Sequence, residues 1–167
     1  MRRAAVAAAM LAFSLGASAD SKSASIGVSA TLVNACEAGS NAGSNVNFGS
    51  LDFGTVSFLH RALTTTGQQN AGAIRVKCNS GTGYAVLLGG GQSGTPTARY
   101  LQNAAGQRVN YGLYTSASYS VVWDDQTGVT QVANGQDQWL AVYGRIPAQA
   151  TPATGIYTDT VQVTINW

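Results

Sequence analysis

Short runs in which apolar and polar residues alternate recur along this chain, and they restrict its fold more than any other feature. The clearest run closes the sequence, where Val161, Val163, Ile165 and Trp167 alternate with polar residues. A period of two places successive side chains on opposite faces of a β-strand, so each run predicts a strand with one buried face. Further strands are predicted at 26–32, 74–78, 84–88, 109–113, 120–123 and 140–143, and around 46–58.

Turn-forming residues separate these runs. Asn134-Gly135 lies between apolar segments at 129–133 and 139–145 and predicts a β-hairpin. Gly- and Ser-rich stretches at 37–45 and 89–94 predict loops. No helical periodicity follows the first 19 residues, so the sequence predicts one all-β domain, an antiparallel sandwich or barrel.

The N-terminus has the pattern of a secretory signal peptide. Arg2 and Arg3 precede an apolar run at 4–15, and Ala17-Ser18-Ala19 offers small residues for cleavage. The alternative is a retained membrane anchor, but the run is well short of the roughly 20 residues that span a bilayer. We therefore expect residues 1–19 to be removed, no membrane insertion, and export through a periplasm to the cell surface.

Removal of the leader changes the charge balance. The full chain has nine Lys and Arg against seven Asp and Glu, and loss of Arg2 and Arg3 leaves seven of each. A mature chain of zero formal charge has no basic footprint for nucleic acid. It also lacks the net repulsion that keeps soluble proteins apart, which suits a protein that assembles.

Cys36 and Cys78 are the two cysteines of the chain. An even cysteine count in an exported protein predicts a disulfide, here with one possible pairing. Closing a loop of about 40 residues stabilises a fold by about 4 kcal/mol in the chain-entropy model. Two buried free thiols are the alternative.

The residues that catalysis requires are scarce. His60 is the one histidine and lies near no nucleophile motif, and Glu37 is the one glutamate. Asp124-Asp125 has no further acidic residues at calcium-loop spacing. Gly89, Gly91 and Gly94 fit G-x-G-x-x-G, but no helix pattern and no acidic residue about 20 positions later accompany them. We expect no catalytic, metal or cofactor site.

Several motifs in a fixed order resemble one family. They cover most of the chain beyond the leader, and no single one is specific. They are Phe48-Gly49-x-Leu51-Asp52-Phe53-Gly54, Ile74-x-Val76-x-Cys78, Arg99-Tyr100-Leu101, Tyr111-x-Leu113-Tyr114, Val122-Trp123-Asp124-Asp125, Tyr143-Gly144-Arg145-Ile146-Pro147 and Gly155-x-Tyr157-x-Asp159-Thr160-Val161-x-Val163-x-Ile165-x-Trp167. Together they resemble the spore coat protein U family, whose members include subunits of archaic chaperone–usher pili.

The resemblance implies an incomplete immunoglobulin-like sandwich that lacks its last strand. In such subunits a periplasmic chaperone first fills the groove with one of its own strands, and in the pilus the N-terminal strand of the next subunit replaces it. A periplasmic chaperone and an outer-membrane usher are therefore implied as partners. The resemblance also implies a structural role in a pilus or surface coat, in adhesion and biofilm, with copies of itself or related subunits as partners. A shaft and an adaptor subunit, or a pilus and a spore coat, are not separated by these motifs.

Two segments fit this mode of assembly. Residues 20–32 precede the predicted domain at 33–167, and Ile26, Val28, Ala30 and Leu32 would insert as donor-strand side chains. Val161, Val163, Ile165 and Trp167 would form the edge that faces a chaperone. The alternatives are a first strand of a complete sandwich at 26–32 and an ordinary central strand at 161–167.

A different function class remains open at this level. A self-contained, secreted, lectin-like sandwich would bind ligands as a monomer and need no chaperone. Exposed Trp123 or Trp139 beside polar loops would be the place for such a site. A secreted hydrolase is the third class, and the scarcity of catalytic residues argues against it.

Overall fold

The computed structural model describes residues 25–39 and 46–167. The chain divides into two units, Met1–Leu32 and Val33–Trp167. In the first unit, the described residues 25–32 belong to no strand, and their apolar side chains are exposed, with Val28 at 91%. The second unit contains every strand found among the described residues, together with the core, and it is all-β and antiparallel as the alternation predicts.

Eleven strands and two single turns of 3₁₀ helix make up the described part of the second unit. They are β1 (Cys36–Ala38), β2 (Leu63–Thr66), β3 (Ile74–Cys78), β4 (Gly83–Leu88), η1 (Gly91–Ser93), η2 (Pro96–Ala98), β5 (Tyr100–Gln102), β6 (Arg108–Asn110), β7 (Gly112–Tyr114), β8 (Val129–Val132), β9 (Gln138–Leu140), β10 (Tyr143–Ile146) and β11 (Val163–Asn166).

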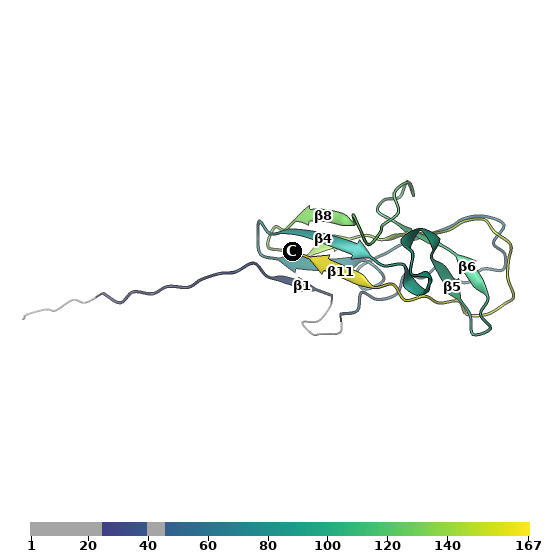
Figure 1. Cartoon of the computed structure of the whole chain (residues 1–167), viewed down its shortest axis with the longest axis horizontal. Helices are drawn as coiled ribbons and strands as arrows, with labels where there is room; N and C mark the ends of the chain where they lie inside the picture. Colours follow the sequence, from purple (N-terminus) through teal and green to yellow (C-terminus); the bar gives the residue numbers. More distant parts are fainter. Residues whose placement is uncertain (1–24, 40–45) are drawn as a thin grey trace, which may run out of the picture. The chain divides into compact units, whose positions relative to one another are not determined.

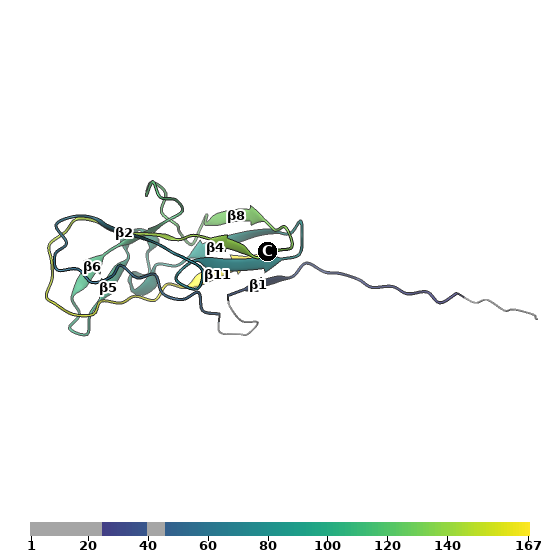
Figure 2. The same cartoon turned by 180° about the vertical axis from the view of Figure 1, so that it is seen from behind.

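Short antiparallel ladders connect these strands into sheets. The orders are β1-β3-β9, β2-β10-β7 and β11-β4-β8, with β5 and β6 forming a separate pair. The β11-β4-β8 sheet stands out in both views, with β5 and β6 beside each other farther along the molecule (Figure 1, Figure 2). Buried residues of β3, β4, β7 and β10 belong to one hydrophobic core, so the three sheets share it as the layers of a β-sandwich do.

The core follows the predicted alternation. In β3, Ile74, Val76 and Cys78 are buried, and Val76 has no exposed surface. In β4, Tyr84, Val86 and Leu88 are buried in the same way. Burying one large apolar side chain stabilises a fold by about 1.5–3 kcal/mol, so these two strands anchor the sandwich.

The disulfide predicted from the cysteine count is present between Cys36 and Cys78. The two residues are direct partners in the ladder between β1 and β3, and their Cα atoms lie 4.0 Å apart. The bond therefore fixes the start of the compact unit to a central strand.

The predicted hairpin at Asn134-Gly135 is wrong, although the turn itself is present. Gly135 has a φ of 82°, and the Asn134 side chain accepts a hydrogen bond from the Gln136 amide. The strands on either side pair elsewhere, because β8 joins β4 and β9 joins β3. The turn therefore carries the chain from one sheet to another.

Three other predicted strands differ in the structure. The run at 109–113 is divided between β6 and β7, and the run at 139–145 between β9 and β10. The segment at 120–123 contributes only a single bridge, between Val122 and Tyr114. The alternating side chains are nevertheless buried as predicted. The face on which a side chain lies follows from the local alternation along the strand, whereas the choice of partner strand depends on residues far away in the sequence.

Candidate functional site: an open apolar groove

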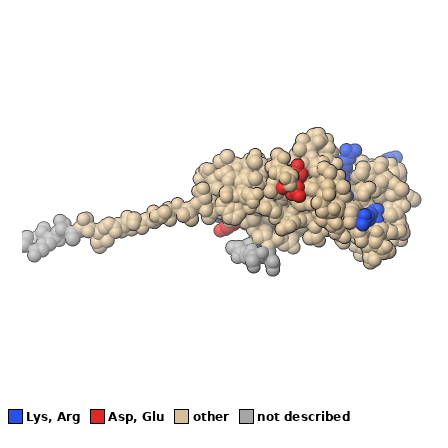
Figure 3. Space-filling model, in the orientation of Figure 1, with Lys and Arg blue, Asp and Glu red and all other residues tan. Residues whose placement is uncertain are grey.

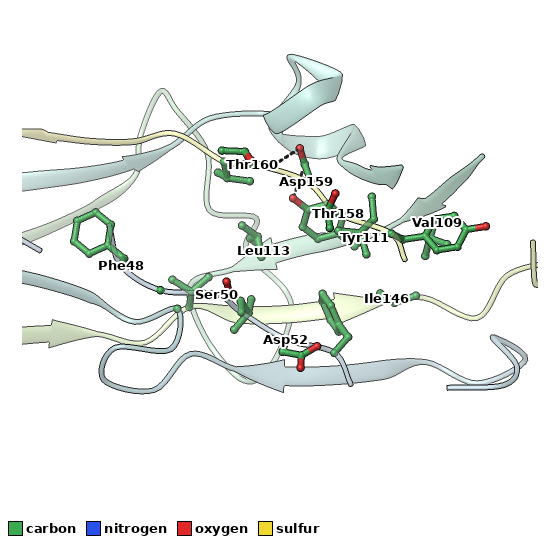
Figure 4. Close-up of a pocket in the computed structure, with 18 of the residues that line it drawn as sticks. Phe48, Ser50, Asp52, Val109, Tyr111, Leu113, Ile146, Thr158, Asp159 and Thr160 are labelled. Atoms are coloured by element: carbon green, nitrogen blue, oxygen red, sulfur yellow. Dashed lines mark hydrogen bonds between the residues drawn. The ribbon is translucent and has the colours of Figure 1, made fainter. Parts of the chain in front are cut away.

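A groove of about 1830 Å³ runs along the compact unit. One wall is the extended segment 46–59, and the other is the C-terminal segment 151–167. The floor includes buried core side chains, among them Leu113, Val142 and Ile146. Figure 4 shows Leu113 between the segment that carries Phe48 to Asp52 and the segment that carries Thr158 to Thr160.

Both walls lack β-sheet partners on their groove side. Strand β11 is an edge strand, because β4 is its one ladder partner among the described residues. On the opposite wall, no described residue from 50 to 58 belongs to a strand or bridge, although 46–58 is predicted as strand. Within that stretch the Gly54 amide donates to the Asp52 side chain, which forms a local turn. Unpaired backbone groups of this kind accept an added strand.

Apolar side chains of the hydrophobic core are incompletely buried along this groove. Twelve apolar residues pack on the core while staying partly exposed, and ten of them line the groove. The incomplete burial is therefore concentrated at one place instead of being spread over the surface. The ten are Cys36, Phe48, Leu51, Phe53, Leu63, Leu101, Tyr157, Val161, Val163 and Ile165.

One end of the groove is polar. Asp159 lies on the same face of its segment as Val161 and Val163, and it accepts a hydrogen bond from the Tyr111 hydroxyl at 2.7 Å. The Asp159 carboxylate also accepts the backbone amides of Gln92 and Thr160. Burial, reinforced by the hydrogen bond to Asp159, raises the pKa of Tyr111. This end therefore has its polar side chains paired with one another, next to the apolar side chains of Val161 and Val163.

Arg99 stabilises the polar end of the groove from within the core. It is 1% exposed, and it donates hydrogen bonds to the backbone carbonyls of Leu88, Gly89 and Trp123 at 2.7–2.9 Å. Burial lowers the pKa of Arg99. Its Nη1 atom has no hydrogen-bond partner among the described residues. The side chain thus satisfies carbonyls where β4 ends.

The predicted site residues have different positions. Val161, Val163, Ile165 and Trp167 all line the groove, and Trp167, past the end of β11, keeps 62% of its surface exposed. The proposed donor side chains Ile26, Val28, Ala30 and Leu32 lie in the other unit and are exposed. Their assignment as a donor strand stays a prediction.

The tryptophan suggested as an exposed binding residue is buried. Trp123 is 1% exposed, and its indole N–H donates to the Val86 carbonyl at 2.8 Å. Trp139 is half-buried beside Arg75, its partner across the ladder. Sequence reasoning also missed Leu51 and Phe53 as groove-lining residues, although the alternation of 51 with 53 was a usable signal.

Other kinds of site find little support in the described part of the chain. No group of three or more histidine, cysteine or acidic side chains is placed to hold a metal ion there. His60 is exposed and packs near Phe58. None of the helices described is long and apolar enough to cross a bilayer. Charged side chains are sparse on the face shown in Figure 3, so no basic patch appears on it.

Comparison with known proteins agrees with this geometry. The model of the spore coat protein U domain matches residues 22–164, which is most of the chain. The chain belongs to the spore coat protein U domain family. Protein U of Myxococcus xanthus is 28% identical over 96% of this chain and 93% of its own length.

A solved structure has a similar fold. It is the CsuC–CsuE chaperone–tip adhesion subunit pre-assembly complex from archaic chaperone–usher Csu pili of Acinetobacter baumannii. The match has a TM-score of 0.50 at 20% identity and covers 82% of this chain. The chain spans about two fifths (40%) of that solved chain, so the similarity concerns the sandwich fold.

Proposed function

We propose that this protein is a structural subunit of a chaperone–usher type pilus or surface coat. The observation that carries the proposal is the groove, in which a largely apolar floor lies between two walls that, among the described residues, have no strand partner on the groove side. A β-strand inserted there would bond to both walls and cover the exposed core. Membership of the spore coat protein U domain family supports the same role.

The inserted strand is proposed to be residues 20–32 of another copy or of a related subunit. Ile26, Val28, Ala30 and Leu32 share one face of an extended chain, and their alternation fits a groove that is open along its length. Each large apolar side chain buried there adds about 1.5–3 kcal/mol. Ala30 is small and would contribute less than the other three.

A chaperone and an usher are the proposed assembly partners. A groove of this apolarity exposes the isolated subunit to aggregation, so a protein that covers it before assembly is needed. The similar fold in the Csu complex was solved together with a chaperone, which supports a chaperone for this chain. We place Val161, Val163, Ile165 and Trp167 at that contact, next to the free edge of β11.

Export, location and biological role follow from the same proposal. Residues 1–19 would direct the chain across the inner membrane, and the disulfide Cys36–Cys78 suits the oxidising periplasm beyond it. The mature domain at 33–167 would then be displayed on the cell surface, in adhesion and biofilm. The chain would act through binding and assembly, without catalysis.

A denaturing gel without boiling tests strand exchange. The mature protein should give a ladder that collapses on boiling, because completed sandwiches resist detergent, and a variant lacking residues 20–32 should give a monomer band. Val28→Asp should remove the ladder, since it would place a charge in an apolar groove.

Ser29→Asp is the matched control. It adds the same charge one residue later, on the opposite face of the extended segment, and should keep the ladder. A folded wild-type protein that runs as a monomer without boiling would overturn the proposal and favour a self-contained binding module. Equal ladders in Val28→Asp and Ser29→Asp would show that residues 20–32 are not the donor strand.

A further inference from the structure

The sheet that forms part of the groove floor has a second face with a different chemistry. Leu113 of β7 and Ile146 of β10 point into the groove, and the alternate residues Tyr114, Tyr143 and Arg145 point the other way. Tyr114 and Tyr143 are direct partners in the ladder between β7 and β10. None of these three residues lines the groove, so strand insertion would leave them accessible.

A glycine makes room for an aromatic ring on this face. A Cβ atom at Gly112 would lie 2.7–2.8 Å from the hydroxyl and ring atoms of Tyr114. The Tyr114 ring therefore lies over Gly112. Tyr119 packs against Tyr114 edge to face, with ring centroids 5.5 Å apart and planes at 90°. The two rings hold each other in a fixed orientation.

The backbone of Tyr119 is strained, so the loop that carries this ring positions it at a cost in free energy. Tyr119 has a φ of 54°, a left-handed conformation that a glycine would adopt without strain. The Tyr119 amide donates to the Ser116 carbonyl, and the Thr115 amide to the Val121 carbonyl, each at 3.1 Å. Strain of this kind concentrates at binding sites, where the side chain is the reason for retaining it.

An unpaired cation completes the arrangement. The guanidinium carbon of Arg145 lies 5.7 Å from the centroid of the Tyr119 ring. Among the described residues, the one ion pair is Arg75–Asp137, so Arg145 has no carboxylate in contact. On the loop that carries Tyr119, the hydroxyls of Ser116, Ser118 and Ser120 form a row with 2.8 Å between successive oxygens.

We propose that Tyr114, Tyr119 and Arg145 form a binding site for an acidic sugar, a uronic acid residue of a polysaccharide. The planar guanidinium suits a carboxylate, to which it can donate two parallel hydrogen bonds. The electron-rich ring faces attract the polarised C–H groups of a sugar ring. The serine hydroxyls supply donors and acceptors for sugar hydroxyls.

Two other polyanions fit less well. A nucleic acid is held by several cations along its backbone, whereas Arg145 is the one cation found over the Tyr119 ring among the described residues. An acidic peptide could not pair with β10, which carries Arg145, because β10 is the middle strand of its sheet. If the subunit polymerises, each copy presents the same site, and repeated weak contacts add up on a polysaccharide.

Calorimetric titration of the full mature chain with tri-galacturonate tests the site. Tyr119→Gly should weaken binding about tenfold or more, because it removes the ring but suits the left-handed backbone. Its thermal midpoint should equal or exceed that of the wild type, which separates lost binding from misfolding. Arg145→Gln should weaken binding at least as much.

Three controls make the outcome decisive. Arg108 packs over the Tyr100 ring at 4.0 Å elsewhere on the unit, so Arg108→Gln should bind like the wild type. The methyl ester of the same trisaccharide should bind about tenfold more weakly, because it lacks the charge. Tri-galacturonate binding that is absent, equally strong for the ester, or unchanged in Tyr119→Gly would overturn the proposal. Tighter binding of a short polyglutamate would also overturn it, in favour of a peptide partner.

The acidic-sugar site and strand exchange can fail separately. Tyr119→Gly should give the same ladder on an unboiled gel as the wild type, because Tyr119 does not line the groove. If the mature protein gave no ladder but still bound tri-galacturonate, the strand-exchange proposal would fail and the sugar-site proposal would stand.

Discussion

Arg99 shows how one buried charge organises the fold. It binds the Leu88, Gly89 and Trp123 carbonyls at the point where β4 ends and the chain continues toward η1. Removing it would leave three buried carbonyls without a donor. Arg99 belongs to one of the motifs that carry the family resemblance, but its partners are 10–24 residues away and could not be predicted from that motif.

We predict that Arg99→Met lowers the free energy of unfolding by about 3 kcal/mol or more, since buried groups that lose a charged partner are costly. Urea unfolding of the monomer measures this. Arg108→Gln is the control, because Arg108 is exposed, and it should cost less than about 1 kcal/mol. Equal losses in the two variants would contradict the role given to Arg99.

Tyr111 makes the stability sensitive to alkaline pH. Its pKa is raised in the folded state, first by burial and then by the hydrogen bond to Asp159. The unfolded chain ionises at its ordinary pKa of about 10 while the folded chain stays neutral. The stabilisation from Tyr111 is thus fully present below that pH and is lost as the pH rises above it.

The prediction is a steeper loss of stability above about pH 10 in the wild type than in Tyr111→Phe. One tyrosine contributes a slope of about 1.4 kcal/mol per pH unit. Urea midpoints between pH 8 and pH 11 measure the difference. Near neutral pH the variant should be about 1 kcal/mol less stable, since it loses one hydrogen bond. Parallel curves would show that Tyr111 ionises freely in the folded state.

The groove wall at 46–59 is held by side-chain packing instead of a ladder. Leu51 and Phe53 lie against Gly144 of β10, where a Cβ atom would approach their side chains to 2.8 and 2.9 Å. The strand prediction for 46–58 failed here because the groove side of this segment has no partner. Its extended conformation and alternating burial were nevertheless predictable from the sequence.

We predict that Gly144→Ala costs about 1–3 kcal/mol in the free energy of unfolding, because the added methyl displaces Leu51 and Phe53. Gly83→Ala is the matched control, since no heavy atom lies within 4 Å of a Cβ at that strand position. It should change stability by no more than about 0.5 kcal/mol. A neutral Gly144→Ala would mean that the wall does not pack on β10.

The elements divide into those the sequence could predict and those it could not. β3, β4 and β11 were predictable, because alternation with buried apolar residues is a local property. The pairing of β8 with β4 and of β9 with β3 was not, since an Asn-Gly turn serves a hairpin and a crossing between sheets equally well. The groove itself was anticipated through the family resemblance and not through any residue pattern.

At the scale of the whole molecule, the sandwich has an open groove into which we propose that one more strand inserts. The partly exposed core residues gather along the groove, and the edge of β11 is free. A compact unit with this defect should be stabilised by any strand of the right pattern. The alternation in residues 20–32 has that pattern, and residues 25–32 have their apolar side chains exposed.

Thermal unfolding of a rearranged chain tests this claim most directly. Residues 20–32 would be deleted from the N-terminus of the mature protein and joined after Trp167 through a short Asn-Gly turn, so that they can return beside β11. We predict a monomer with a midpoint well above that of the deletion variant, because the groove is filled. The same rearrangement with Ile26, Val28 and Leu32 changed to Ser should give no such increase. Equal midpoints for the apolar and the serine versions would contradict the account.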